Sequence, residues 1–503
     1  MTRRIAIIGA GPGGICMGIK LREAGFDDFT IFERAPGVGG VWYHNTYPGA
    51  ACDVQSALYS FSFELKRDWS RPYATQPEIR AYFEHCVEAY GLAPHIRLNT
   101  RVSAAHWDDE RSEWRVITEP GVTDHLDTGG AARHAEEHLF DVVIGAVGMF
   151  NELHVPDIAG LDEFRGTRFH SARWDHSHDL SGERVAVVGS AASAVQFVPE
   201  IAPGVERLHV FQRTPNWVLP KLDTPYTDDE LERFRTDPDA IVEERALVWD
   251  RLDGFITFSN PRAVRKAQEW GELNLAVVED AALRRELTPD FPHGCKRPLV
   301  SNEWFPTFNR PNVELVTRPI ERVTADAIVT VDGATRAVDT IVLATGFDTT
   351  KYLSVVDVTG RDDRRLADAW SDGARAYLGL TTAGFPNLFM LYGPNTNNGS
   401  ILFMIECQVG YVLRHLHRMD THGLASIDVR VDVMDEYNHA LQDDLDAVEV
   451  WNAGCNGYYR GPTGRIVTQW PHTMTEYQGR TDRADFDAYD SRAARNTRRQ
   501  TAR

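Results

Sequence analysis

The chain has 503 residues and a formal net charge of −20 at pH 7, with 43% hydrophobic and 25% charged residues. Its length exceeds the size at which a single hydrophobic core stops growing, so we expect two or three domains. Binding to DNA or RNA depends on cationic patches that neutralise phosphates, and the acidic balance argues against it.

A glycine-rich turn follows the first apolar run. Residues 4–8 predict a strand and a helical pattern continues to about Ala24, and the turn between them reads Gly9-Ala10-Gly11-Pro12-Gly13-Gly14. In this setting the second glycine lets the backbone approach a pyrophosphate, whose charge the helix N-terminus attracts. The next predicted strand, 29–32, ends at Glu33, which would accept hydrogen bonds from ribose hydroxyls and repel a 2′-phosphate. The pattern predicts an adenosine dinucleotide site, and the alternative is a turn without a ligand.

A second unit of the same kind begins at residue 184. Residues 184–188 predict a strand and a helix follows to about Ile201, and the turn between them reads Gly189-Ser190-Ala191-Ala192-Ser193-Ala194. Ala191 replaces a glycine, and its Cβ points where a pyrophosphate would approach, which leaves open how tightly this turn binds. Arg213 lies 213 − 189 = 24 residues beyond Gly189, as Glu33 lies 33 − 9 = 24 residues beyond Gly9. An arginine there pairs with a 2′-phosphate, so the second ligand is predicted to be NADPH and not NADH, and the alternative is an exposed arginine at a strand end.

The segment between the two units carries a pattern of its own. It reads Phe164-Arg165-Gly166-Thr167-Arg168-Phe169-His170-Ser171-Ala172-Arg173-Trp174-Asp175. The order F-x-G-x-x-x-H-x-x-x-W-D resembles the fingerprint of the Baeyer-Villiger monooxygenases at every fixed position. Because the segment lies between two nucleotide-binding units, we interpret Phe164, Gly166, His170, Trp174 and Asp175 as a joint that controls when two cofactors meet. The alternative is a linker with a buried phenylalanine and tryptophan and a solvated histidine.

A second motif resembles the same family. It reads Gly39-Gly40-Val41-Trp42, then Tyr47-Pro48-Gly49, then Cys52-Asp53. In the family this stretch lies along FAD, with the aspartate beside the reactive ring. The resemblance implies that FAD contacts Gly40, Val41, Trp42, Asp53, Tyr59 and the backbone of Val102, and that Cys52 and Asp53 also border NADP. The alternative for the aromatic residues is core packing.

The third motif is Lys296-Arg297-Pro298, which resembles a Lys-Arg pair of the family. The resemblance implies that Lys296 reaches the 2′-phosphate, beside Arg213 and Thr214, and that Arg297 enters the active site near Asp53. Arg297 and Asp53 are therefore the predicted catalytic residues. The alternative is a basic pair on the surface.

Together these motifs predict an α/β fold with two Rossmann-like dinucleotide-binding domains, for FAD and NADP, and a helical insertion in the second. The predicted segments are 1–148 and 341–480 for the FAD domain, 149–175 for an interdomain linker, 176–340 for the NADP domain with its insertion at about 221–292, and 481–503 for a flexible tail.

Finer expectations concern single elements. In the insertion, a capping box, Thr227-x-x-Glu230, opens a helix. Six apolar residues recur there at helical spacing and are interpreted as packing residues of an insertion that roofs a substrate pocket: Ala263, Ala267, Trp270, Leu273, Val277 and Ala281. Residues 119–137 predict a surface loop, a long helix follows Gly399, and 451–459 and 467–470 predict short strands.

Cysteine spacing and hydropathy bear on the compartment. The six cysteines are far apart and include no C-x-x-C pair, so they predict reduced thiols and neither a dithiol centre nor a zinc or other metal site: Cys16, Cys52, Cys86, Cys295, Cys407 and Cys455. The apolar run from Ile5 to Ile19 is better explained as a nucleotide-binding turn than as a signal peptide, and residues 401–413 are too few to span a bilayer. We therefore expect a soluble cytoplasmic protein that binds neither membrane nor nucleic acid and has no obligate protein partner.

The resemblance also implies an activity. NADPH would reduce FAD, the reduced flavin would capture O₂ as a C4a-peroxyflavin, and this would insert an oxygen atom into a ketone to give an ester or lactone. One alternative is a flavin monooxygenase that oxidises nitrogen or sulfur, against which the Trp174-Asp175 ending argues. Another is a non-catalytic protein that senses nucleotides. The sequence does not indicate which ketone is used.

Overall fold

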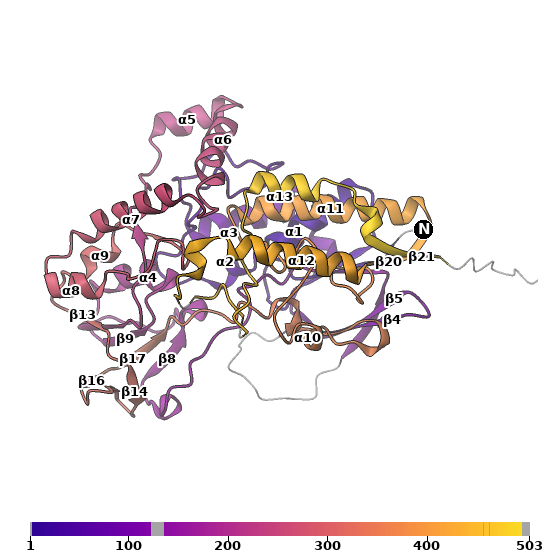
Figure 1. The fold of residues 1–503 in the computed structure, drawn as a ribbon. Coiled ribbons are helices and arrows are strands. Elements are labelled where there is room, and N and C mark those ends of the chain that lie inside the picture. The colour runs from indigo at the N-terminus through magenta and orange to yellow at the C-terminus, as the bar shows by residue number, and fades with distance from the viewer. Residues whose placement is uncertain (1–2, 122–134, 456, 462, 495–503) are drawn as a thin grey trace, which may run out of the picture.

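The structure is a computed structural model that describes residues 3–121, 135–455, 457–461 and 463–494. Two five-stranded parallel sheets form its centre, each flanked by helices, and a group of helices rises from the second domain (Figure 1). The predicted α/β class with two Rossmann-like units is confirmed by the parallel pairing within each sheet. None of the helices in the described ranges is long and apolar enough to cross a membrane.

The first sheet has the order β19-β7-β1-β2-β3. Its middle strand, β1, pairs with β2 in the register Ile5↔Phe29 and with β7 in the register Ile5↔Val142. Every residue of β1 is buried, as a parallel strand covered on both faces requires. The strands are β1 (Ile5–Ile8), β2 (Phe29–Phe32), β3 (Ile96–Arg97), β7 (Val142–Gly145) and β19 (Leu388–Met390). Because β19 pairs with β7, the chain returns to the first sheet after completing the second.

Helices and a smaller sheet complete the first domain. The helices are α1 (Pro12–Glu23), α2 (Val41–His44), α3 (Gln76–Ala89), α10 (Leu366–Ala369), α11 (Ile401–Thr421), α12 (Val431–Asp446) and α13 (Met474–Thr481). The smaller sheet contains β4 (Thr100–Asp108), β5 (Glu113–Pro120), β6 (Glu136–Phe140) and β18 (Asp357–Thr359). Helix α11 confirms the long helix predicted after Gly399. Most of the surface loop predicted at 119–137 lies outside the described residues.

The second sheet has the order β13-β10-β9-β17-β8. Its strands are β8 (Thr167–His170), β9 (Arg184–Val188), β10 (Arg207–Phe211), β13 (Val313–Val316) and β17 (Thr340–Leu343). Around it lie α4 (Ala192–Ile201), α9 (Trp304–Thr307), the short pair β11 (Val218–Leu219) and β12 (Leu299–Val300), and the meander β14 (Ile320–Val323), β15 (Ala327–Thr330) and β16 (Thr335–Ala337).

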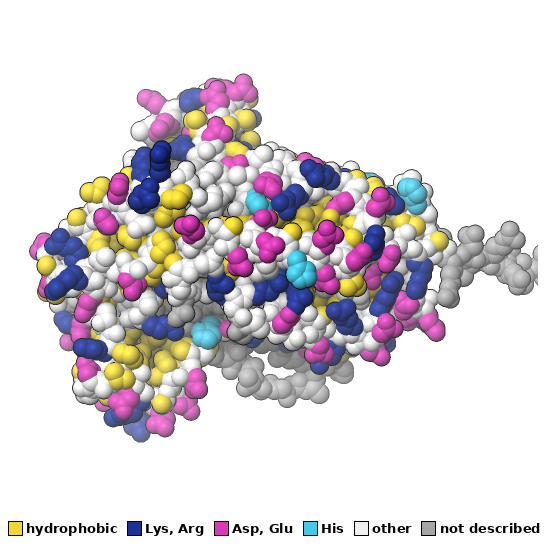
Figure 2. All heavy atoms as spheres, viewed as in Figure 1, with side chains coloured by type: hydrophobic (Ala, Val, Ile, Leu, Met, Phe, Trp, Pro, Cys, Tyr) yellow, Lys and Arg dark blue, Asp and Glu magenta, His cyan; other side chains and the backbone are white. Residues whose placement is uncertain are grey.

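The insertion is helical, as predicted. It contains α5 (Asp228–Thr236), α6 (Ala240–Asp253), α7 (Pro261–Leu275) and α8 (Ala281–Glu286). The capping box is confirmed, because Thr227 Oγ1 accepts from the Glu230 amide while the Glu230 carboxylate accepts from the Thr227 amide. Helices α5 and α6 project from the body of the molecule, and acidic side chains gather at their tip (Figures 1 and 2).

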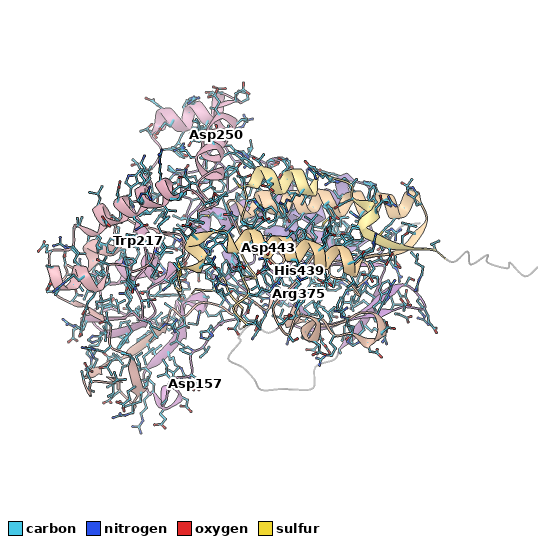
Figure 3. The ribbon with its side chains drawn as sticks, viewed as in Figure 1. Asp157, Trp217, Asp250, Arg375, His439 and Asp443 are labelled. Carbon is cyan, nitrogen blue, oxygen red and sulfur yellow. A yellow bond between two sulfur atoms is a disulfide. The ribbon has the colours of Figure 1, made fainter. Side chains whose placement is uncertain are left out.

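Four of the predicted packing residues of the insertion are exposed. Trp270, Leu273 and Val277 are 47%, 69% and 46% exposed and Ala281 is exposed as well, so their predicted packing role is wrong. The buried face of α7 consists of Val264, Ala267, Gly271 and Leu275. Apolar residues recur on two faces of this helix, and only the face with small side chains fits against the domain. At Gly271 a Cβ would lie 2.7 Å from the ring of Trp217, which lies beside this helix (Figure 3).

The C-terminal region differs from its prediction in two ways. The tail predicted at 481–503 is ordered as far as residue 494, because β21 (Tyr489–Ala493) pairs antiparallel with β20 (Leu424–Val429). Residues 495–503 lie outside the described residues. The strands predicted at 451–459 and 467–470 are wrong: a 3₁₀ turn at Glu449–Asn452 and irregular backbone occupy these stretches. Apolar and aromatic residues here fill the core next to α11 without joining a sheet.

The fingerprint segment is more than a linker. Residues 167–170 form β8, the edge strand of the second sheet, in the register Leu343↔His170. The predicted linker, 149–175, therefore includes a strand of the domain that it was expected to precede. Gly166 enters this strand where a Cβ would lie 2.2 Å from the carbonyl oxygen of Asp339, so no larger residue fits.

The cysteines are not all reduced. Cys295 and Cys455 are joined by a disulfide, which corrects the prediction of six free thiols. The four others are free and buried: Cys16, Cys52, Cys86 and Cys407. The bonded pair is separated by 160 residues, and only the folded chain brings it together.

Candidate active site

One large cavity takes in both glycine-rich turns. Its volume is about 1950 Å³, which exceeds the roughly 300–1,000 Å³ typical of a site for one small molecule, so it has room for more than one ligand. Both turns, Glu33, Asp53, Arg213 and Arg297 line it. The parallel sheets explain this, because the turns that follow β1 and β9 lie at the carboxyl edges of their sheets, where open α/β sheets bind ligands.

The first turn has the shape of a pyrophosphate site. Gly9 has a φ of +107°, and a Cβ on it would lie 2.7 Å from the carbonyl oxygen of Ala146. No side chain in the described ranges caps the N-terminus of α1, which leaves its amide groups available to an anion. The buried carboxylate of Glu33 accepts hydrogen bonds from the amides of Ala10 and Ala35, both at 2.8 Å. Burial raises the pKa of Glu33, and these hydrogen bonds oppose the rise.

The second turn repeats this geometry. Gly189 has a φ of +116°, and a Cβ on it would lie 2.3 Å from the carbonyl oxygen of Ala344. Ala191 is the N-cap residue of α4, and again no described side chain caps the helix. Because Ala191 has an ordinary extended backbone, the residue fits the turn itself, and its methyl group faces the cavity.

Two cations meet at one end of the cavity. Lys296 Nζ donates a hydrogen bond to Thr214 Oγ1 and lies 4.8 Å from the centroid of the Phe291 ring. Burial lowers the pKa of Lys296, and the positive charge of Arg213 lowers it further. Because the two positive charges repel each other, a doubly charged phosphate bound beside them would stabilise both.

Arg297 and Asp53 form an ion pair on the cavity wall. Arg297 Nε donates to Asp53 Oδ2 at 3.0 Å, and Nη2 donates to the same oxygen. Burial by itself would lower the pKa of Arg297, but the charge and hydrogen bonds of Asp53 outweigh it and raise this pKa well above its usual value. About a third of the Arg297 side chain, 35%, remains open, and this part faces the cavity. The pair therefore presents a permanent positive charge to whatever the cavity binds.

Aromatic residues of the second motif line the same wall. Trp42 Nε1 donates to the hydroxyl of Tyr59 at 2.9 Å, and the two rings meet edge to face. Burial raises the pKa of Tyr59 and of Cys52, so both side chains stay protonated. Val102 also lines the cavity. The aromatic side chains of this wall could pack against a planar ring.

The predicted cofactor residues divide into two groups. Those that line the cavity are Gly9, Gly11, Gly13, Glu33, Gly40, Val41, Trp42, Cys52, Asp53, Tyr59, Val102, Gly189, Ser190, Ala191, Ala192, Ser193, Arg213, Thr214, Lys296 and Arg297. Gly14 and Ala194 do not. A Cβ on Gly14 would lie 1.9 Å from the carbonyl oxygen of Gly9, so this glycine closes the turn, and Ala194 is buried in the core of the second domain.

The fixed residues of the fingerprint do not line the cavity. His170 is 5% exposed, and its Nδ1 accepts from the amide of Ala172 at 3.1 Å. Burial lowers the pKa of His170 to about 4. Trp174 packs edge to face on Phe197 of α4, with the ring centroids 5.1 Å apart. Asp175 caps the following turn by accepting from the amide and hydroxyl of Ser177.

Several residues at the domain contact were not predicted. Tyr47 lies in the hydrophobic core of the second domain, and its hydroxyl donates to Gln196 Oε1 at 2.9 Å. Gln196 Nε2 donates in turn to the carbonyl of Ala51 at 3.0 Å. Gly49 lies so close to α4 that a Cβ would be 2.8 Å from the carbonyl oxygen of Gln196. A glutamine inside a helix gives no signal in the sequence, although the Tyr47-Pro48-Gly49 motif could have indicated a close contact.

Tyr458 is the other residue that the sequence did not indicate. It lines the cavity with Arg297; burial raises the pKa of its hydroxyl, and the positive charge of Arg297 opposes the rise. It lies more than 150 residues beyond Arg297 in the chain, in a stretch predicted as strand, so no spacing rule connects the two.

Comparisons with known proteins agree with this geometry. The family model of flavin-binding monooxygenase-like proteins matches residues 2–353. A Baeyer-Villiger monooxygenase of Pseudomonas aeruginosa is 42% identical over 97% of this chain and 91% of its own length. A closed crystal structure of cyclohexanone monooxygenase superimposes with a TM-score of 0.85 at 29% identity, covering 98% of this chain and 99% of that one. A structure of the enzyme OTEMO in complex with FAD and NADP superimposes with a TM-score of 0.82 at 28% identity, covering 97% and 99%. The chain therefore belongs to the flavin-binding monooxygenase-like family, among its Baeyer-Villiger monooxygenases.

Proposed function

We propose that this protein uses NADPH and O₂ to insert an oxygen atom into a ketone, giving an ester or lactone, with FAD as its bound cofactor. The observation that carries the proposal is the Arg297–Asp53 ion pair on the wall of a cavity shared by two dinucleotide turns. The chain belongs to a family of flavin-binding monooxygenases, and a solved neighbour contains both FAD and NADP. Bound FAD, once NADPH has reduced it, supplies the activated oxygen atom.

The first domain fits FAD. The uncapped N-terminus of α1 and the close approach of Gly11 to Gly40, where a Cβ would lie 3.5 Å from Gly40 Cα, form a cradle for a pyrophosphate. The Glu33 carboxylate uses two acceptor positions on its own turn and keeps others for ribose hydroxyls. The wall formed by Trp42 and Tyr59 would hold the ring system.

The second domain fits NADPH. The uncapped N-terminus of α4 would receive the pyrophosphate, and Arg213, Thr214 and Lys296 would hold the 2′-phosphate. Phosphate binding would also relieve the repulsion between Arg213 and Lys296 that lowers the pKa of Lys296. The methyl group of Ala191 shifts the pyrophosphate slightly outward from this turn.

Arg297 would act on the reaction through its charge. It faces the cavity and is held in the charged form by Asp53, so it stabilises negative charge that develops on oxygen. At a separation of about 4 Å and an effective dielectric constant near 20, this interaction is worth about 4 kcal/mol. Asp53 would orient Arg297, because two nitrogens of the Arg297 guanidinium donate hydrogen bonds to the Asp53 carboxylate.

The ketone would enter beside the insertion. The cavity wall on that side is largely apolar and comes from α6 and the segment after it: Val248, Leu252, Phe255, Ile256 and Phe258. An apolar wall favours ketones with hydrocarbon bodies and leaves the carbonyl oxygen to the polar end near Arg297.

We place the reaction in the cytoplasm, where NADPH is available, and propose that it needs no protein partner.

The test begins with the purified protein, which should be yellow and should consume O₂ in an NADPH-dependent reaction that ketones accelerate. A panel of ketones, amines and sulfides, with products identified by mass spectrometry, separates ketone oxygenation from oxidation of nitrogen or sulfur. Arg297→Ala should retain FAD but divert NADPH consumption from ester to hydrogen peroxide. Arg297→Lys should restore only part of the ester yield, since an ammonium group keeps the charge but loses the fork that engages Asp53. An alanine variant with the parent ratio of ester to NADPH would contradict the role of Arg297.

A further inference from the structure

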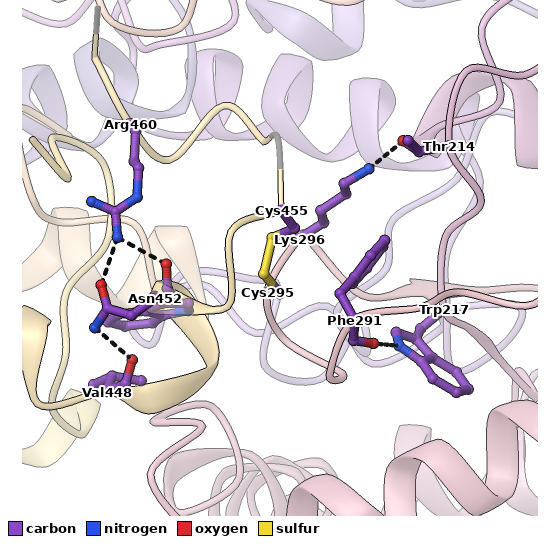
Figure 4. Close-up of a disulfide and its surroundings, with 10 residues drawn as sticks. Thr214, Trp217, Phe291, Cys295, Lys296, Val448, Asn452, Cys455 and Arg460 are labelled. Atoms are coloured by element: carbon purple, nitrogen blue, oxygen red, sulfur yellow. Dashed lines mark hydrogen bonds between the residues drawn. A yellow bond between two sulfur atoms is a disulfide. The ribbon is translucent and has the colours of Figure 1, made fainter. Parts of the chain in front are cut away.

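The disulfide lies immediately beside the cationic residues of the active site. Cys295 precedes Lys296 and Arg297, and its partner Cys455 belongs to the segment 451–460 of the first domain (Figure 4). The two Cα atoms are 6.2 Å apart. The bond therefore ties the second domain to the first at the point where both contribute residues to the cavity.

Segment 451–460 touches both cations. At Gly457 a Cβ would lie 3.6 Å from Lys296 Cγ and 3.9 Å from the carbonyl oxygen of Cys295. The next residue, Tyr458, lines the cavity with Arg297, whose positive charge acts on its hydroxyl. The positions of Lys296 and Arg297 thus depend on where this segment lies.

Other contacts also hold this segment at its two ends: Thr349 Oγ1 donates to the carbonyl of Tyr458, and the amide of Val467 donates to the carbonyl of Tyr459 at 3.0 Å. Arg460 Nη2 donates to the carbonyl of Trp451 at 2.9 Å and to Asn452 Oδ1 at 2.7 Å, which ties one end to the other (Figure 4). Ala453 and Gly454, in the bend that precedes Cys455, are exposed, and Gly454 has a φ of +75°. The disulfide is the covalent contact between this exposed bend and the segment that carries Lys296 and Arg297.

The two cysteines differ in their accessibility. Cys295 is 2% exposed, whereas Cys455 is only partly buried and lies next to the exposed bend. We therefore expect a thiolate from solution to attack at Cys455, which makes Cys295 the leaving group.

We propose that Cys295 and Cys455 are a reversible thiol–disulfide site that positions Lys296 and Arg297, and that its reaction partners are a dithiol reductant and a peroxide oxidant. In the reducing direction, one thiolate of the dithiol attacks Cys455 and releases the Cys295 thiolate. The second thiol of the reductant then displaces Cys455, so that the dithiol leaves as a disulfide and two protein thiols remain. In the oxidising direction, two thiols and one hydrogen peroxide give the disulfide and two waters. A disulfide in a protein that works with NADPH in a reducing compartment is expected to cycle in this way.

Reduction should weaken NADP binding and coupling without unfolding the protein. When the bond is open, the exposed bend at Ala453–Cys455 is no longer tied to the residue before Lys296, and the binding-competent arrangement of Lys296 and Arg297 is populated only part of the time. If that fraction falls to about one fifth, the apparent dissociation constant for NADP⁺ rises about fivefold. The NADP⁺ effect is independent of the proposed ketone reaction, and the effect on ester yield rests on it.

The experiment compares the FAD-loaded parent protein, Cys455→Ser, and Cys407→Ala as a matched control that removes a buried thiol outside the pair. Thiols are counted by mass spectrometry after alkylation of the denatured protein. Of the six cysteines, four should react in peroxide-treated parent and six after tris(2-carboxyethyl)phosphine. The reductant should raise the NADP⁺ dissociation constant of the parent and of Cys407→Ala about fivefold, to the value of Cys455→Ser, which should not respond. Peroxide treatment after removal of the reductant should restore the parent value.

Two results would overturn the proposal. One is six reactive thiols, counted in the denatured protein after peroxide treatment, which would show that the bond does not form. The other is an NADP⁺ dissociation constant that is the same with and without the bond, which would make the disulfide a passive link. A protein that oxygenates no ketone yet passes both tests would contradict the proposed function and leave the thiol–disulfide site standing.

Discussion

Single residues in equivalent positions of the two turns carry opposite charges. Gly9 and Gly189 both have a positive φ. Gly9 lies against the carbonyl oxygen of Ala146, directly after β7, and Gly189 lies against that of Ala344, directly after β17, so the two turns are built alike. After the next strand, the first unit has Glu33 and the second has Arg213. In the proposed function, the shared backbone would let both turns bind dinucleotides, and the charge at this position would select which dinucleotide each one binds.

Replacing Arg213 should therefore narrow the preference for NADPH over NADH. A charge-assisted hydrogen bond is worth about 1.5–3 kcal/mol, so Arg213→Ala should lower kcat/KM for NADPH by roughly tenfold or more while that for NADH changes little. Arg322→Ala, an exposed arginine outside the cavity that pairs with Glu321, is the matched control. Steady-state oxidation of both nicotinamides gives the ratio, and equal rates in the parent protein would contradict the assignment.

At the scale of elements, strand β8 connects the fingerprint to the domain contact. The strand ends at His170, and Trp174 follows it onto Phe197 of α4. The ring of Tyr47, from the first domain, packs on the same Phe197 at a centroid distance of 6.0 Å. If the second sheet moves relative to the first, the packing of Tyr47 and Trp174 on Phe197 must change. Because the fingerprint side chains lie outside the cavity, we expect them to act through this packing and not by contact with a ligand.

Substitution of His170 or Trp174 should consequently affect turnover more than FAD content. Trp174→Ala removes the contact with Phe197 and should slow oxygenation severalfold, whereas Trp174→Phe should keep most of the rate because it retains a ring there. His170→Ala should behave like Trp174→Ala, because the Ala172 amide loses its acceptor. Flavin absorbance gives the FAD content and stopped-flow gives the rates. Loss of flavin in these variants would assign the segment a structural role only.

Strand β21 gives a second test at this scale. Tyr489 is buried, and its hydroxyl is hydrogen bonded to Thr381 and Tyr411, while Arg492 pairs with Asp109. A chain that ends at residue 481 loses these contacts, and burying one aromatic side chain alone contributes about 1.5–3 kcal/mol. We expect its melting temperature to fall by several degrees. A chain that ends at residue 494 keeps every one of these contacts and should melt like the parent, and equal melting of both truncated forms would show that β21 adds no stability.

On the scale of the whole molecule, burial of histidines makes stability depend on pH. Burial lowers the pKa of His170, His293 and His415 to about 4 from an ordinary value of 6.5. Between these values the unfolded chain binds more protons than the folded one, so stability is full above pH 6.5 and is lost as the pH falls toward 4. Asp428 acts in the opposite direction, because burial raises its pKa to about 6, and it offsets part of this loss.

Replacing one of these histidines should make the free energy of unfolding less sensitive to pH on the acid side. For His415, a difference of about 2.5 pKa units corresponds to about 3 kcal/mol. Between pH 6.5 and pH 4, the free energy of unfolding of His415→Gln should therefore fall by about 3 kcal/mol less than that of the parent protein. Urea unfolding at each pH measures this difference. His176→Gln, which changes an exposed histidine, should keep the parent slope. A slope that is unchanged in His415→Gln would assign the acid sensitivity to other groups.

The sequence by itself determined the features that depend on neighbours in the chain. The two strand–turn–helix units follow from hydrophobic runs and glycines a few residues apart, and the slots of Glu33 and Arg213 follow from a fixed count along each unit. Helices α1 and α4 were predicted nearly to their ends for the same reason, and the start of α11 was predicted after Gly399. The motif Lys296-Arg297 could be recognised, but its resemblance to a family, and not its spacing, indicated that it would lie near Asp53.

Only the tertiary structure decided which distant segments meet. Strand β8 joins the second sheet because β17, more than 150 residues later, offers it an edge. Residues 482–494 are ordered because β20 does the same for β21. Tyr458 reaches Arg297, and Cys455 reaches Cys295, across 160 residues of chain. Contacts of this kind depend on packing in three dimensions, and a local pattern carries no record of them. The spacing of the apolar residues of α7 was enough to predict a helix. It did not show which face of the helix is buried, because that depends on the small side chains that fit against Trp217.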